Sequence, residues 1–218
     1  MATEAIRDMT HIVAGPTPTA DPSPRRANRP MSHPPGTILG MSRHPLAALT
    51  RLRTWTLLHL QRVVVLDTET TDLDGQICEL SIVDAHGAIL LDTLIRPTCP
   101  ITPAARAVHG ITDEDLAGAP TLAQLWPTIA WLLHDVRIAA YNAPFDRDAL
   151  IRSCAAHGID PGPAADPRRW TCIMRARSRV ERRRWQRLDA GHRALGDAQA
   201  AREVLVAIAH GRLLAAVA

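Results

Sequence analysis

Four carboxylates follow a run of apolar residues in the segment VVVLDTETTDLDG, residues 63–75. Asp67 and Glu69 are two positions apart, and such residues in an extended chain project from the same face, about 7 Å apart. Both side chains can therefore reach one cation at the end of a strand, where open α/β sheets place their ligand sites. The other two acids, Asp72 and Asp74, are predicted to belong to a turn. The pair alone is weak evidence, because solvated strand ends also carry acids.

Two later segments contain acids in comparable settings. In IAAYNAPFDRDAL, a strand is expected to end at Tyr141 and a helix to begin at Phe145, which places Asp146 in the first helical turn. An acid there also complements the helix dipole, which is a complete structural explanation. In GHRALGDAQAAREVLVAIA, Asp197 begins an amphipathic helix and His192 is expected on the preceding loop or first turn. Each segment alone has such a structural explanation.

The segments DTET, NAPFD and HRALGD, in this order, resemble the motifs of the DEDDh (DnaQ-like) 3′–5′ exonucleases, a family that includes the proofreading epsilon subunit of bacterial replicative polymerase. The resemblance covers about residues 62–210 and extends to VHGIT (108–112) and RWQRL (184–188). It implies an α/β, RNase H-like fold with a mixed five-stranded sheet flanked by helices. The residues that it implies to be catalytic are Asp67, Glu69, Asp146, His192 and Asp197.

The resemblance also implies metal-dependent hydrolysis of phosphodiesters. Two divalent ions about 4 Å apart can activate a water and stabilise the leaving oxygen. Carboxylate oxygens favour Mg²⁺ or Mn²⁺, and we expect two such ions. By resemblance the metal ligands are Asp67, Glu69, Asp146 and Asp197, and His192 is the general base.

The expected substrate contacts flank these motifs. Thr70 and Thr71 could hold the terminal 3′-hydroxyl, and Leu73 and Phe145 could wedge against the last bases, because stacking on an aromatic ring tolerates any sequence. A Phe at a helix start is nevertheless more often a core residue. By resemblance, His109 and Asn142 are also expected at the nucleotide.

An arginine cluster precedes His192. Residues 168–187 contain nine arginines and one acid, Glu181. A solvated helix face would explain this composition, but a phosphate track leading to the site would need such a patch, and we favour the track.

The leading function is a 3′–5′ exonuclease acting in the cytoplasm on single-stranded 3′ ends, DNA rather than RNA, as in DNA repair or proofreading. The alternatives are an exoribonuclease that trims RNA ends or short oligoribonucleotides, a non-catalytic nucleic-acid-binding module, and a polymerase-associated subunit. A polymerase partner is possible but not indicated. The cysteines at 78, 99, 154 and 172 are scattered, which argues against a zinc knuckle and suits a reducing compartment. No apolar run is long enough for a membrane span.

The chain is expected to divide into a disordered Pro-rich leader (1–45), a helix packed on the domain (46–61) and the exonuclease domain (62–218). If translation begins at Met31 or Met41, the leader is shorter or absent. Within the domain the pattern predicts a buried strand over 62–67, a hairpin of 77–85 and 88–97, short strands at 137–141 and 170–174, a short helix opened by Thr102-Pro103, and helices over 122–134, 145–157 and 194–209.

Overall fold

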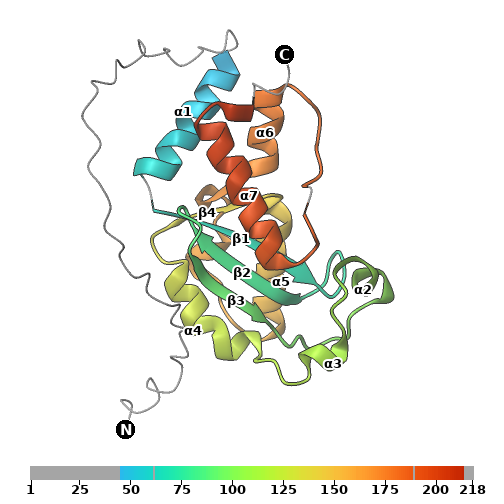
Figure 1. Cartoon of the computed structure of the whole chain (residues 1–218). Coiled ribbons are helices and arrows are strands. Elements are labelled where there is room, and N and C mark those ends of the chain that lie inside the picture. Colours follow the sequence, from blue (N-terminus) through green and yellow to red (C-terminus); the bar gives the residue numbers. More distant parts are fainter. Residues whose placement is uncertain (1–44, 61, 189, 214–218) are drawn as a thin grey trace, which may run out of the picture. The chain divides into compact units, whose positions relative to one another are not determined.

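The computed structural model describes residues 45–60, 62–188 and 190–213 (Figure 1). The predicted leader, apart from Pro45, lies outside these residues. Among the helices that are described, none has both the length and the hydropathy needed to cross a bilayer.

A five-stranded sheet forms the centre of the described part, in the order β3-β2-β1-β4-β5. Its strands are β1 (Val63–Thr70), β2 (Ile77–Asp84), β3 (Ile89–Leu94), β4 (Arg137–Ala140) and β5 (Trp170–Cys172). β1, β2 and β3 pair antiparallel, whereas β4 is parallel to both β1 and β5. The expected mixed sheet and its opening hairpin are therefore confirmed.

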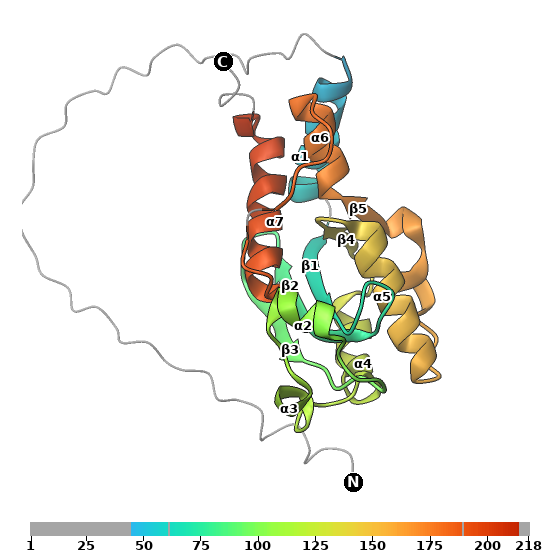
Figure 2. The same cartoon turned by 90° about the vertical axis from the view of Figure 1, so that its right-hand side faces the viewer.

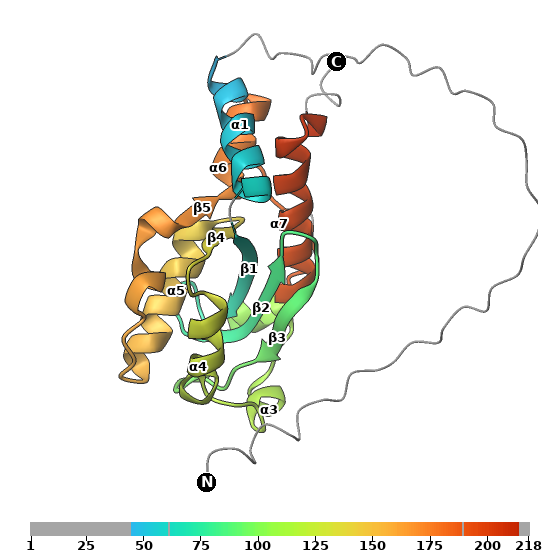
Figure 3. The ribbon, with the colours of Figure 1, turned by 90° about the vertical axis from the view of Figure 1, so that its left-hand side faces the viewer.

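Helices cover both faces of the sheet (Figures 2 and 3). They are α1 (Pro45–Leu60), α2 (Pro103–His109), α3 (Asp113–Leu116), α4 (Leu122–Leu132), α5 (Ala143–Ala156), α6 (Ile173–Glu181) and α7 (Ala194–Ala209). Alternation along β1 sends Val64 and Leu66 into a core shared with α4 and α5, and Val63 and Val65 into a second core shared with α1, α6 and α7. Burial on both faces fits its continuous apolar run.

Several element boundaries differ from the sequence prediction: the predicted strand 88–97 ends at Leu94, and the predicted helix 122–134 ends at Leu132. β1 does not end near Asp67 but continues to Thr70, because β2 pairs with it past the carboxylates. The helix predicted over 145–157 begins at Ala143, since Pro144 is tolerated in the first helical turn. The strand predicted over 170–174 stops at Cys172, and the arginine-rich segment after it forms α6.

Candidate active site

The first two acids lie within β1, on the face of the sheet that α7 covers. Asp67 and Glu69 share this face with Val63 and Val65, as the two-residue period requires. Asp67 is half-buried, and Glu69 is only 9% exposed. The last strand pairs form a rigid support for both carboxylates, because β2 stays in register with β1 as far as Glu69.

Asp146 approaches the same end of β1 from α5, on the opposite face. It is buried in the first turn of α5, as its sequence predicts. The Thr68 hydroxyl, which points to the α5 face, donates a hydrogen bond of 3.0 Å to Asp146 Oδ1. Thr68 thus connects the strand between the two acids to the acid on the helix, a contact that sequence reasoning did not identify.

The third group of residues comes from the start of α7. Asp197 lies in its first turn, and His192 lies on the loop before the helix, as expected. His192 has a left-handed backbone (φ 52°), an uncommon conformation for a residue other than glycine. Ligand atoms of Glu69, His192 and Asp197 all lie within 4.8 Å of one another. His192 Nε2 also contacts Arg187 Nη2.

Burial and mutual repulsion raise the pKa values of these acids. Burial is the main cause for Asp67, whose pKa is raised well above its usual value, with further increases from the charges of Asp146 and Asp197. Burial and the neighbouring Asp197 and Glu79 raise the pKa of Glu69 to about 8. Burial raises the pKa of Asp146 to about 7, although its Thr68 hydrogen bond opposes the shift. Crowded acids of this kind need a counter-charge to be ionised together.

The donor set fits a divalent cation. Asp197 Oδ1 is buried and has no hydrogen-bond partner among the described residues. Asp197 also belongs to the group in which Glu69 and His192 offer ligand atoms, and burial raises its pKa as it does those of the neighbouring acids. Oxygen-rich clusters of this charge suit hard divalent ions.

Glu79 is an important residue of this region that the sequence interpretation missed. It is the partner of Glu69 across the β1–β2 pair and is only 4% exposed. Its carboxylate accepts hydrogen bonds from Arg193 Nε at 3.0 Å and from the Ala194 N–H at 2.9 Å. Arg193 has no capping side-chain bond of its own, so Glu79 satisfies the first N–H of α7 from the neighbouring strand. The available signal was one acid inside the apolar run ICELSIV.

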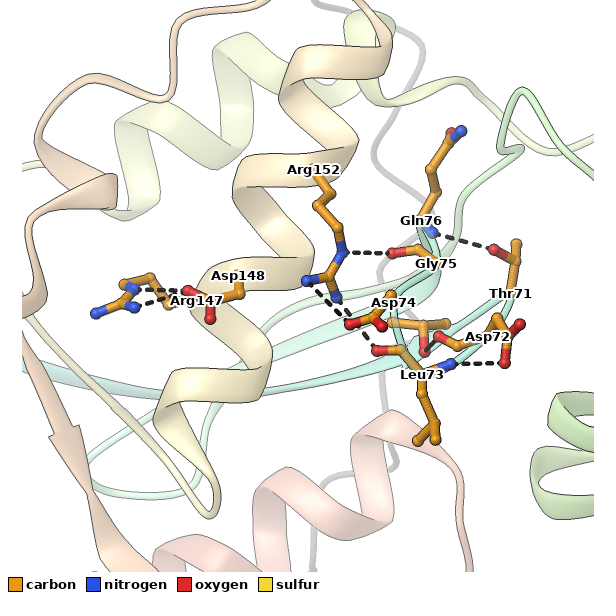
Figure 4. Close-up of polar contacts among 10 residues, drawn as sticks. Thr71, Asp72, Leu73, Asp74, Gly75, Gln76, Arg147, Asp148 and Arg152 are labelled. Atoms are coloured by element: carbon orange, nitrogen blue, oxygen red, sulfur yellow. Dashed lines mark hydrogen bonds and ion pairs between the residues drawn. The ribbon is translucent and has the colours of Figure 1, made fainter.

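The loop after β1 contains the acids predicted to be turn residues, and the structure confirms that prediction (Figure 4). Asp72 accepts a hydrogen bond from the Leu73 N–H at 2.8 Å, and the Gly75 N–H closes the turn on the Asp72 carbonyl at 2.9 Å. Arg152 of α5 holds the loop through the Gly75 carbonyl at 3.2 Å. Asp74 points to solvent, 3.9 Å from Arg152.

The six residues expected at the substrate differ in exposure. Leu73 is 78% exposed, Asn142 is exposed and Phe145 is half-buried. Thr70 and Thr71 are buried. The Thr70 hydroxyl donates to the Asp72 carbonyl, and the Thr71 hydroxyl accepts from the Gln76 N–H.

His109 is buried between two backbone groups. Its Nε2 lies 3.2 Å from the Thr70 carbonyl, and its Nδ1 accepts a hydrogen bond from the Ile111 N–H at 3.0 Å. These contacts assign the proton to Nε2 and tie α2 to the end of β1, so both ring nitrogens are used within the protein.

Comparison with known proteins identifies the family to which this arrangement belongs. A family model described as an exonuclease, RNase_T, matches residues 64–205, which is well over half of the chain. The chain belongs to the RNase_T exonuclease family. Members of this family generally use divalent metal ions, in agreement with the donor set described above.

Two curated relatives match the RNase_T region. The uncharacterized exonuclease CP81 of Escherichia phage 186 is 37% identical over 99 residues, which cover 44% of this chain and 51% of the phage protein. Exodeoxyribonuclease 10 of Escherichia coli K12 is 31% identical over 137 residues, covering 60% of this chain and 52% of the relative. The chain thus spans about half the length of these relatives.

A solved structure shares the fold at low sequence identity. It is a 3′-exonuclease that recognises the 3′ end of the histone mRNA stem-loop. It superposes with a TM-score of 0.55 and 13% identity, covering 69% of this chain and 64% of its own. The expected RNase H-like fold is therefore confirmed.

Proposed function

We propose that the chain is a metal-dependent 3′–5′ exonuclease that releases nucleoside monophosphates from single-stranded nucleic acid, DNA in the first place. The observation that carries the proposal is the convergence of ligand atoms of Glu69, His192 and Asp197 within 4.8 Å, together with an Asp197 oxygen that has no hydrogen-bond partner in the described part of the chain. The exonuclease domain is proposed to span residues 62–218. We also propose a cytoplasmic location, because the four scattered cysteines of the sequence suit a reducing compartment.

In this proposal, Asp67, Glu69, Asp146 and Asp197 would hold two Mg²⁺ or Mn²⁺ ions, whose charge would be available to neutralise the phosphate and to acidify a water. His192 accepts the proton of that water. For this role one ring nitrogen must be neutral and free, so the Arg187 contact at Nε2 has to be released or the proton has to go to Nδ1.

The substrate contacts are proposed on the basis of exposure. Leu73 and Phe145 are proposed to pack against the terminal bases, and Asn142 to contact the nucleotide. Thr70, Thr71 and His109 have inward-directed polar groups. We therefore propose that they contribute to substrate binding indirectly, by fixing the backbone at the end of β1.

A single digestion experiment tests the proposal. DNA and RNA oligonucleotides carrying a label at the 5′ end, and matched ones labelled at the 3′ end, are incubated with Mg²⁺ or Mn²⁺. We expect a ladder of shortening 5′-labelled strands and immediate release of the 3′ label as a mononucleotide. Asp67→Ala should abolish both. Release of the 5′ label first would contradict the direction, and no shortening of either polymer would contradict the enzyme and favour a non-catalytic binding module.

An exoribonuclease remains the alternative substrate class, and the RNA arm of the same experiment decides between them. Faster digestion of RNA than of DNA would replace the DNA preference. A polymerase partner is not part of the proposal, because no described surface points to one.

A further inference from the structure

A pocket of about 640 Å³ lies between α1, α5 and α6, at the sheet edge formed by β4 and β5. Figure 2 shows α1 and α6 side by side above β5. Five arginines line the pocket, and no described lining residue is acidic. They are Arg53 of α1, Arg137 of β4, Arg147 of α5, and Arg175 and Arg179 of α6.

This positive charge is largely uncompensated within the described part of the chain. Of the five arginines, Arg147 alone forms an ion pair there, with Asp148 at 2.7 Å. Arg137 Nε is buried and has no hydrogen-bond partner among the described residues. Arg175 and Arg179 are four residues apart on one helix, where like charges repel. A bound anion would relieve the repulsion within this cluster.

Two helix N-termini add to the positive potential. The first residues of α5, Ala143 and Pro144, line the pocket, and so does Cys172, the N-cap of α6. Neither N-cap residue makes a side-chain hydrogen bond to its helix. The Phe145 N–H of α5 donates to the Asn142 carbonyl at 2.8 Å, and the Met174 N–H of α6 donates to the Tyr141 carbonyl at 3.0 Å. The positive end of each helix dipole therefore adds to the potential of the arginines, which carry the main charge of the pocket.

The pocket is distinct from the candidate active site but is connected to it through α5. None of the five predicted catalytic residues lines the pocket. In the first turn of α5, Asp146 contacts Thr68 of β1, whereas the adjacent Arg147 lines the pocket. One helical turn therefore contributes to both sites.

We propose that this pocket binds phosphate groups of a single-stranded nucleic acid, as a second contact region of the substrate. Guanidinium groups bind phosphate oxygens with two parallel hydrogen bonds, so five of them select for phosphate rather than for a lone carboxylate. The volume suits one or a few nucleotides of a flexible strand. The nucleic-acid source of the phosphate rests on the proposed function, whereas binding of phosphate itself does not.

Binding without catalysis tests the pocket independently of the enzyme reaction. The full chain is titrated in EDTA with a labelled long single strand and with a dinucleotide, over a range of salt concentrations. For Arg175→Gln/Arg179→Gln, the slope of log affinity against log salt for the long strand should fall by about 0.7 for each phosphate that the variant no longer binds. Because the pocket has room for one or a few nucleotides, dinucleotide binding should weaken in the variant as well. Arg96→Gln/Arg106→Gln, exposed residues outside the pocket, removes the same charge and is the control.

Thermal unfolding distinguishes loss of a ligand site from loss of structure. Because two repelling, exposed arginines are removed, the double variant should unfold at the wild-type temperature or slightly above it. Pyrophosphate should raise the wild-type Tm and leave that of the variant unchanged. If the variant keeps the wild-type salt slope, the nucleic-acid proposal is overturned. If pyrophosphate nevertheless no longer raises the Tm of that variant, the pocket binds a free phosphate ligand instead. If wild-type enzyme digests no polymer but the salt slope still falls, the proposed function fails while the pocket stands.

Discussion

His192 has two features at the residue scale that suit a movable base. It lies outside α7, with a left-handed φ of 52°, and a ring nitrogen lies within 4.8 Å of ligand atoms of Glu69 and Asp197. We predict that His192→Ala lowers kcat roughly 10²–10⁴-fold, the usual contribution of a general base. Because the carboxylates remain, stabilisation of the fold by Mn²⁺ should persist, as measured by thermal unfolding with and without the ion.

The matched control for this variant is His157→Ala, at the C-cap of α5. It removes an imidazole from a position with no place in the proposed reaction, so its kcat should stay at the wild-type value. Turnover by His192→Ala at that same rate would show that another group takes the proton.

The raised pKa values of the acids predict a pH dependence of the metal-free protein. An acid whose pKa is higher in the folded than in the unfolded state binds more protons when folded, so the free energy of unfolding falls as pH rises. The pKa of Glu69 is raised to about 8 and that of Asp146 to about 7, so the free energy of unfolding should decrease from about pH 4 to pH 8. Thermal unfolding in EDTA across this range measures it.

Metal should reverse this dependence. Mg²⁺ binds the ionised carboxylates and displaces their protons, so its stabilising effect should grow with pH over the same range. Asp67→Asn removes one of the repelling charges and should flatten the EDTA profile. An EDTA profile that rises between pH 5 and 8 would be incompatible with acids crowded as they are here.

At the scale of elements, Glu79 connects β2 to the start of α7. Its bonds to Arg193 and to the Ala194 N–H position the residues that follow His192. We predict that Glu79→Gln, which keeps the shape but loses the charge, lowers kcat about tenfold or more, with a smaller change in KM. The free energy of unfolding should fall by about 1–3 kcal/mol, as expected for a buried acceptor that loses charged partners.

A double mutant separates positioning from simple destabilisation. If Glu79 acts by holding His192 in place, adding Glu79→Gln to His192→Ala should lower kcat little further. If the fold-reduction in kcat of the double mutant equals the product of the two single-mutant reductions, Glu79 has a role independent of His192. The kinetics are measured below the unfolding temperature of every variant.

The strong periodic elements of this protein were readable from its sequence, and the contacts between elements were not. The amphipathic pattern predicted Ala194–Ala209 without error, and the apolar run located β1. The continuation of β1 to Thr70 depends on pairing with β2, and α6 depends on packing of Ile173 and Val180 in a core that only the tertiary structure defines.

The same distinction applies to the candidate site. The spacing of Asp67 and Glu69 implied a shared face, which the structure confirms. Thr68 and Glu79 bond to partners 78 and 115 residues away. The acid within ICELSIV could single out Glu79, but no local pattern could identify the partner of either residue. The five arginines of the pocket come from four elements and likewise share no sequence motif.

At the scale of the whole described molecule, the two faces of the sheet are closed differently. One face is covered by α4 and α5, from the middle of the chain, whereas the other is covered by helices that include both ends of the described chain (Figures 1 and 2). There α1 packs on α6 and α7, and Leu57 belongs to their common core. The helix before the domain is therefore part of its core.

This arrangement predicts that α1 contributes to the stability of the exonuclease fold. Leu57 is 5% exposed, so Leu57→Ala should lower the free energy of unfolding by about 2–5 kcal/mol through lost burial and a residual cavity. Leu46→Ala, on the same helix but 59% exposed, should change it by no more than about 0.5 kcal/mol. Denaturant unfolding of both variants measures the difference. Equal, small effects would mean that α1 is detached in solution and that the face covered by α6 and α7 is stable without it.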